Sequence, residues 1–176
     1  MHRWAEERFA STGFPPLAAL TMWRQLIGAS THVESPLSVS YSVDFPEHLW
    51  LAREYFGLQI GLHAAATLEE AMAQMQDGTS NILLLPADVT APCWPMAKAL
   101  VDAGLMIFAA IPAATQTLPQ GMMPALALAS VTPEPSGNDI SYFLRNGTVE
   151  IIDGFVPSHD DGLFLGAHPR PINLGA

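Results

Sequence analysis

The sequence has few basic residues. Its 176 residues include 7 Lys and Arg against 17 Asp and Glu, which gives a formal net charge of -10. A chain of this charge repels polyanions and has no basic patch for phosphate groups, so a nucleic-acid partner is not expected. A site for a dianion needs several Arg or Lys donors, and the basic residues here lie far apart along the chain.

The sequence also lacks paired cysteines, long apolar runs and the common catalytic motifs. Cys93 is the single cysteine, which excludes a disulfide within the chain and fits a reducing compartment. No run approaches the roughly 18 apolar residues of a membrane span, so we expect a cytoplasmic protein. The motifs GxGxxG, GxxxxGK[ST], GxSxG and HExxH are all missing. We therefore expect no cofactor.

What is present is a pattern of short apolar segments separated by 15 prolines and 13 glycines. Residues 2–10 and 17–34 have helical spacing, and Ser35-Pro36 ends the second helix. Strand-like segments then alternate with helical ones. The expected strands are 37–41, 59–63, 81–85 and 105–111, and the expected helices are 47–56, 68–76 (capped by Thr67) and 95–103. The alternation predicts an α/β fold in which N-terminal helices precede a largely parallel sheet with helices on both faces.

The C-terminal part of the chain has a different pattern. A polar, Pro-containing connection covers residues 113–124. Beyond it we expect a small α/β subdomain whose three strands surround a short helix at 139–144. The strands would cover 125–131, 148–156 and 163–168.

Two acidic positions and one short segment are candidates for chemistry. Asp44 and Asp88 each follow an expected strand, where open α/β sheets bind ligands, although a role as a turn or N-cap residue explains either one. The segment 159–161 (HDD) is the densest group of metal-ligand residue types. Because Pro157-Ser158 and Gly162 flank it, we interpret it as an exposed turn and expect no metal site.

Part of the sequence resembles a known family. Segments 14–17 (FPPL), 22–30 (MWRQLIGAS) and 34–41 (ESPLSVSY) resemble the final helix of the all-helical chorismate mutases and the chain that follows it. Segments 47–57, 68–71 and 77–78 are similar to half of a prephenate-dehydratase-type lobe, which is periplasmic-binding-protein-like. The resemblance implies four regions. These are a mutase-like helical remnant (1–35), a dehydratase-like lobe (36–112), the connection (113–124) and a subdomain with a regulatory role (125–176).

The resemblance implies an isomerase of aromatic amino acid biosynthesis that converts chorismate to prephenate. Glu34 stands where that family has a Gln or Glu site residue in its last helix. The family's substrate-binding Arg and Lys residues would lie upstream of Met1, so this chain is expected to be an incomplete catalyst. The dehydratase turns are replaced by 42–46 (SVDFP) and 86–88 (PAD), so dehydratase activity is expected to be lost.

Two further hypotheses remain open. The chain is alternatively a non-catalytic binding or regulatory domain for an aromatic amino acid or a pathway intermediate such as chorismate or prephenate. Phe45, Trp50 and Trp94 lie near strand ends, where they would suit such a ligand or belong to the core. The apolar face of helix 17–34 is also expected to pair with a second subunit, which predicts a homodimer through this helix.

Overall fold

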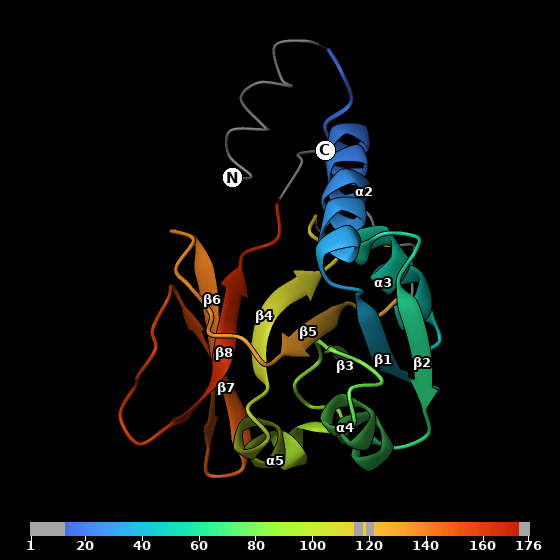
Figure 1. Cartoon of the computed structure of the whole chain (residues 1–176). Helices are drawn as coiled ribbons and strands as arrows, with labels where there is room; N and C mark the ends of the chain where they lie inside the picture. Colours follow the sequence, from blue (N-terminus) through green and yellow to red (C-terminus); the bar gives the residue numbers. More distant parts are fainter. Residues whose placement is uncertain (1–12, 115–117, 119–121, 173–176) are drawn as a thin grey trace.

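The computed structural model describes residues 13–114, 118 and 122–172. They form one eight-stranded sheet with helices on both faces (Figure 1). The strands are β1 Ser38–Ser42, β2 Gly61–Ala65, β3 Ile82–Pro86, β4 Met106–Ile111, β5 Ala125–Ala129, β6 Asp139–Arg145, β7 Thr148–Asp153 and β8 Leu163–Pro169. The helices are α2 Pro16–Glu34, α3 Glu47–Phe56, α4 Leu68–Gln76 and α5 Ala97–Asp102, with a 3-10 turn at Trp94–Met96.

The sheet is mixed, with the strand order β2-β1-β3-β5-β4-β8-β6-β7. Strand β1 is parallel to β2 and β3, and β4 is parallel to β8, whereas the other four neighbouring pairs are antiparallel. The expectation of a largely parallel sheet is therefore wrong. An unbroken apolar segment such as β5 indicates that a strand is covered on both faces, and it carries no information about the direction of that strand.

The expected helix at 139–144 is also wrong, because these residues form strand β6. Residues 140–145 pair with 148–153 of β7 through a hairpin whose turn is Asn146-Gly147, and both turn residues have positive φ. Asn-Gly is the preferred two-residue turn for joining antiparallel strands. This hairpin pairing decides the conformation of 139–145, which the local pattern alone did not.

The remaining expected elements are confirmed within one or two residues at most boundaries. The predicted helices 17–34, 47–56 and 68–76 correspond to α2, α3 and α4, and segment 95–103 contains α5. The expected helix at 2–10 lies outside the described residues. One sheet contains strands from both 36–112 and 125–176, and β5 lies between β3 and β4. The division of the chain at 113–124 stays a prediction.

The core lies on both faces of the sheet because side chains of β3 alternate between them. Leu83 and Leu85 belong to the cluster that includes Trp94 and Leu100, while Leu84 belongs to the cluster with Leu51 of α3. Helices α4 and α5 thus cover one face and α3 covers the other.

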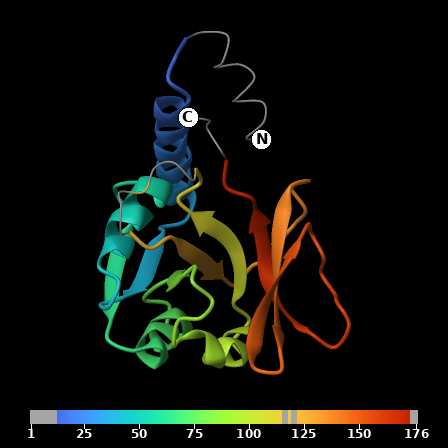
Figure 2. The same ribbon diagram turned by 180° about the vertical axis from the view of Figure 1, so that it is seen from behind.

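Helix α2 packs on α3 and extends beyond the sheet, as the reverse view shows (Figure 2). Its residue Gly28 allows the close contact, since a Cβ atom there would lie 2.1 Å from the Phe56 carbonyl oxygen. No helix in the described part of the chain is long and apolar enough to cross a membrane.

Candidate ligand-binding site

A crevice lies beside the parallel strands, where β1, β2 and β3 end. It has a volume of about 360 Å³. The loop after β1, the first turn of α4, strand β3 and the segment 91–96 line it. Parallel strands end at one edge of a sheet, and ligands of open α/β folds bind there. The topology therefore supplies a crevice of ordinary ligand size.

Asp44 lies in the wall of this crevice. Its backbone N–H donates to Ser42 Oγ at 3.2 Å, and the neighbouring Phe45 N–H donates to the Ser42 carbonyl oxygen at 3.1 Å. Within the described residues, no hydrogen bond or ion pair engages the Asp44 carboxylate. Helix α3 begins after Pro46 without a side-chain cap, so Asp44 is not its N-cap. The Asp44 carboxylate remains available to a ligand.

The first turn of α4 brings a second carboxylate, that of Glu69, to the crevice. Thr67 Oγ1 accepts the Glu70 N–H at 3.2 Å, which confirms the predicted cap, and Glu70 Oε2 accepts the Ala66 N–H at 2.7 Å. These bonds hold the helix start in place. Thr67 and Glu69 line the crevice on the side opposite β3. Sequence analysis identified neither of them as a crevice residue, although their place directly after a strand carries the same signal that indicated Asp44.

Cys93 is the one thiol of the chain, and it lines the crevice half-buried. Burial raises the pKa of this thiol, and the charge of Asp88 raises it further, against a lowering by a backbone hydrogen bond. At neutral pH the thiol is therefore protonated and a weak nucleophile. Trp94 beside it is fully buried and donates from Nε1 to the Pro86 carbonyl oxygen at 3.1 Å, so it belongs to the core.

Asp88 does not line the crevice, in contrast to Asp44. Its Oδ1 accepts the Thr90 N–H at 2.9 Å and the Thr90 hydroxyl at 2.6 Å. These hydrogen bonds lower the pKa of the exposed Asp88 carboxyl. The side chain closes the turn after β3, which is the alternative role that the sequence left open.

Glu34 is exposed at the end of α2 and, among the described residues, belongs neither to the lining of the crevice nor to that of the smaller cavity between α2, α3 and β4. The structure thus does not bring Glu34 together with Asp44 or Asp88 at one cavity. In the segment 159–161, Asp160 accepts a hydrogen bond from Arg145 at 3.2 Å. No group of three or more possible metal ligands occurs among the residues that the structure places.

His48 lies directly behind the crevice wall. Its ring stacks on Phe45 with 5.2 Å between the ring centroids, and Phe45 lines the crevice. The imidazole is fully buried, and neither ring nitrogen has a hydrogen-bond partner in the described part of the chain. Burial lowers the pKa of His48 to about 4, although the nearby Glu47 charge opposes this shift. At neutral pH, His48 is therefore an uncharged support for Phe45.

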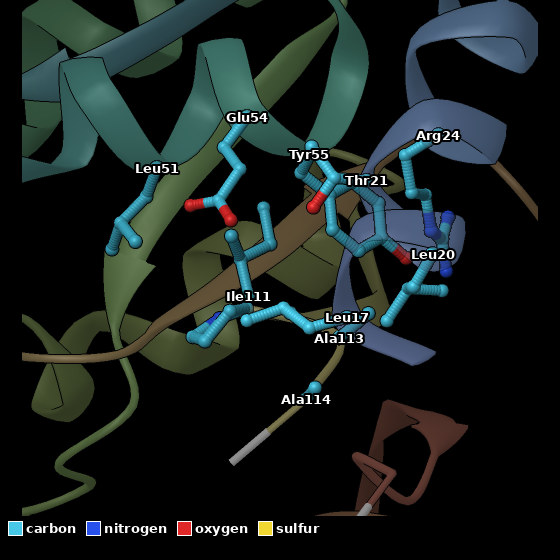
Figure 3. Close-up of a pocket in the computed structure, with 11 residues that line it drawn as sticks. Leu17, Leu20, Thr21, Arg24, Leu51, Glu54, Tyr55, Ile111, Ala113 and Ala114 are labelled. Carbon is cyan, nitrogen blue, oxygen red and sulfur yellow. The ribbon is translucent and has the colours of Figure 1, made fainter. Parts of the chain in front are cut away.

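A second cavity lies between α2, α3 and the end of β4 (Figure 3). The carboxyl group of Glu54 points from α3 toward Ile111, and burial raises its pKa. The space measures about 20 Å³, which is close to that of one water molecule. This cavity is too small for an organic ligand.

Comparison with known proteins yields a structural likeness and no sequence family. No family model matches the chain, and no curated protein matches it in sequence. A solved structure of GqqA, described as a novel type of quorum quenching acylase, is similar with a TM-score of 0.50 and 12% sequence identity. The likeness covers 76% of this chain and 95% of GqqA. At this identity the comparison establishes a shared fold alone.

These findings overturn the resemblance to chorismate mutase and prephenate dehydratase. Neither family appears in the comparisons, and the structural likeness is to an acylase. The segments that suggested the resemblance contain a Pro-Pro helix start, an amphipathic helix and a Ser-Pro stop. Those features are general rules of helix formation, which unrelated helices share. The role of Glu34 rested on that resemblance.

Proposed function

We propose that the crevice at the ends of β1, β2 and β3 binds a small organic amine with an apolar body. The observation that carries this proposal is the charge of its lining. Asp44 and Glu69 are acidic, and no Lys, Arg or His lines the cavity among the described residues. A carboxylate pair beside an apolar surface favours a cation over an anion.

The apolar part of the ligand would lie against β3 and Phe45. Leu83 and Leu85, which share one face of β3, line this side of the crevice, and β3 is buried along its whole length. Ligand sites combine such an apolar surface with a small number of polar groups that orient the ligand. An amine with an aromatic or branched apolar group therefore fits best, in keeping with a binding domain for an aromatic amino acid derivative.

The lining favours binding over catalysis. The Cys93 thiol is protonated at neutral pH, Thr67 Oγ1 caps α4, and Ser42 Oγ accepts a backbone N–H. Covalent catalysis needs a nucleophile with a base in hydrogen-bond reach. No imidazole from the described residues reaches the crevice to activate these groups. We therefore propose a binding module of a reducing compartment such as the cytoplasm, and we do not propose the acylase activity of GqqA for it.

The test compares two ligands of similar size and opposite charge. Binding of 2-phenylethylamine and of 3-phenylpropionate is measured by isothermal titration calorimetry and by the shift of the melting temperature. We expect the amine to stabilise the protein at millimolar concentration and the carboxylate to have no effect. The substitutions Asp44→Asn and Glu69→Gln should each weaken amine binding about two- to fivefold, since an exposed ion pair contributes about 0.5–1 kcal/mol.

Glu34→Gln is the matched control, because it removes one exposed carboxylate that does not line the crevice. It should leave the amine affinity unchanged, which separates a local contact from the effect of net charge. Equal binding of the amine and the carboxylate would contradict the proposal. So would the absence of any stabilisation by the amine.

A further inference from the structure

An exposed apolar surface lies on α2, far from the crevice. Seven of the twelve large hydrophobic side chains that are exposed in the described residues lie within residues 14–33. Five of them form what we call the α2 stripe: Met22, Trp23, Leu26, Ile27 and Val33, with exposed fractions from 37% to 86%. Successive helix residues turn by about 100°, which places these five on one side of the helix. Exposed apolar patches of this kind mark interaction surfaces.

The opposite side of α2 is attached to α3, so the α2 stripe cannot turn inward. Gly28 lies against the Phe56 carbonyl, and Gln25 Nε2 donates to the carbonyl oxygens of Arg53 and Glu54, each at 3.1 Å. The Arg24 guanidinium lies 4.1 Å from the centre of the Tyr55 ring. These contacts fix the rotation of α2 about its axis. Any segment that packs on the α2 stripe must therefore come from outside α2 and α3.

The charge distribution indicates which partner fits. The α2 stripe contains no charged residue, and the charged residues of α2 are Arg24, on the α3 side, and Glu34, at its end. The chain has a net charge of -10, so two copies repel one another through most of their surface. Because the α2 stripe carries no charge, a contact through it adds no close pair of like charges to that repulsion. A two-fold contact brings the same stripe from both copies together.

Other classes of partner fit less well. An amphipathic helix that binds a membrane surface has Lys and Arg on its polar face to attract anionic lipids. Helix α2 contains the single basic residue Arg24 apart from His32, and the net charge of the chain repels an anionic surface. The same charge argues against nucleic acid.

We propose that the α2 stripe is the contact surface for a second copy of this chain, which forms a reversible homodimer. A helix of 19 residues is about 28 Å long and about 10 Å wide. Such a face is smaller than the roughly 800 Å² that each partner buries in a standard interface. The dimer is therefore expected to be concentration-dependent, with a dissociation constant in the micromolar range.

The experiment is sedimentation velocity on the full chain between about 1 µM and about 200 µM, a range that brackets a micromolar dissociation constant. We expect the mass to rise from monomer to dimer across this range. Leu26→Glu and, separately, Val33→Glu should each keep the protein monomeric, because each places a charge against its own copy. Both side chains are more than half exposed, so the melting temperature of each variant should stay close to that of the parent chain.

Ile151→Glu is the matched control. Ile151 is 53% exposed on β7, the edge strand at the opposite end of the sheet from β2, and this variant should dimerise as the parent does. A monomeric parent chain at about 200 µM would overturn the proposal. Equal loss of the dimer in Ile151→Glu and Leu26→Glu would also overturn it. If the full chain stayed monomeric and only a variant without residues 1–12 dimerised, that segment would be the occupant of the α2 stripe instead.

Discussion

His48 illustrates how one residue couples the crevice to pH. It is fully buried at the start of α3 and has no hydrogen-bond partner in the described residues. A buried polar group without such a partner lowers the stability of the folded state. Its stacking on Phe45 places this unfavourable group directly behind the wall of the crevice.

The depressed pKa of His48 predicts a loss of stability in acid. The unfolded chain binds a proton on this ring below about pH 6.5, whereas the folded chain does so only near its pKa of about 4. The free energy of unfolding should therefore fall as the pH drops from 6.5 to 4, by an amount on the order of 3 kcal/mol. His48→Leu should remove this loss and leave the stability at pH 7 equal or higher. Urea unfolding between pH 4 and pH 8 measures both effects.

His63→Gln is the matched control for this prediction. His63 lies on the edge strand β2 and is partly exposed, so His63→Gln removes an imidazole without disturbing the buried ring, and the loss of stability caused by His48 should persist. An unchanged loss of stability in His48→Leu would mean that other groups cause it. The crevice would then have no pH-sensitive support.

At the scale of elements, the contact between α2 and α3 depends on a residue with no side chain. Alanine at an exposed helix position normally stabilises a helix over glycine by up to about 1 kcal/mol. At Gly28 the added Cβ would lie 2.1 Å from the Phe56 carbonyl oxygen and 2.7 Å from the Phe56 carbonyl carbon. The helices must separate to admit it. The steric effect should therefore outweigh helix propensity.

We predict that Gly28→Ala destabilises the protein by about 1–3 kcal/mol, as overpacking in a buried contact does. Thermal unfolding followed by circular dichroism measures the change. The control is Ser30→Ala, an exposed position of the same helix, which should be neutral or slightly stabilising. A stabilising Gly28→Ala would show that α2 does not pack closely on α3.

At the scale of the whole molecule, the two halves of the sheet meet at β4 and β8. Ile107 of β4 pairs with Gly166 of β8, whose φ is +128°. A Cβ atom at Gly166 would lie 2.3 Å from the Ile107 carbonyl oxygen and 2.4 Å from its nitrogen. Backbone in this conformation strongly favours glycine, so both strain and sterics oppose any side chain.

We predict that Gly166→Ala lowers the melting temperature by roughly 5–15 °C, from strain and overpacking on the order of 2–4 kcal/mol. Gly147→Ala is the control, because Gly147 also has positive φ but a Cβ there meets no atom within 4 Å.

The parent chain should unfold in one transition when tryptophan fluorescence and far-ultraviolet circular dichroism are compared, since one sheet spans both halves. Two separate transitions in the parent would support an independent C-terminal subdomain.

The sequence by itself determined the local elements and the edge of the sheet at which the crevice lies. Apolar spacing located α2, α3 and α4, and the position of Asp44 after β1 indicated the crevice edge. The Asn146-Gly147 turn also contained the signal for the β6–β7 hairpin, although the helical interpretation of 139–144 passed over it. Local rules were sufficient for these features because neighbours in the chain decide them.

Only the tertiary structure decided the strand directions, the partners of each carboxylate and the exposed side of α2. Covered strands look alike in both directions, so the insertion of β5 antiparallel between β3 and β4 has no local signature. Asp44 and Asp88 stand in similar sequence positions, yet Thr90 engages Asp88 while the Asp44 carboxylate lines the crevice. These differences arise from contacts between distant segments. The spacing of residues along the chain does not contain them.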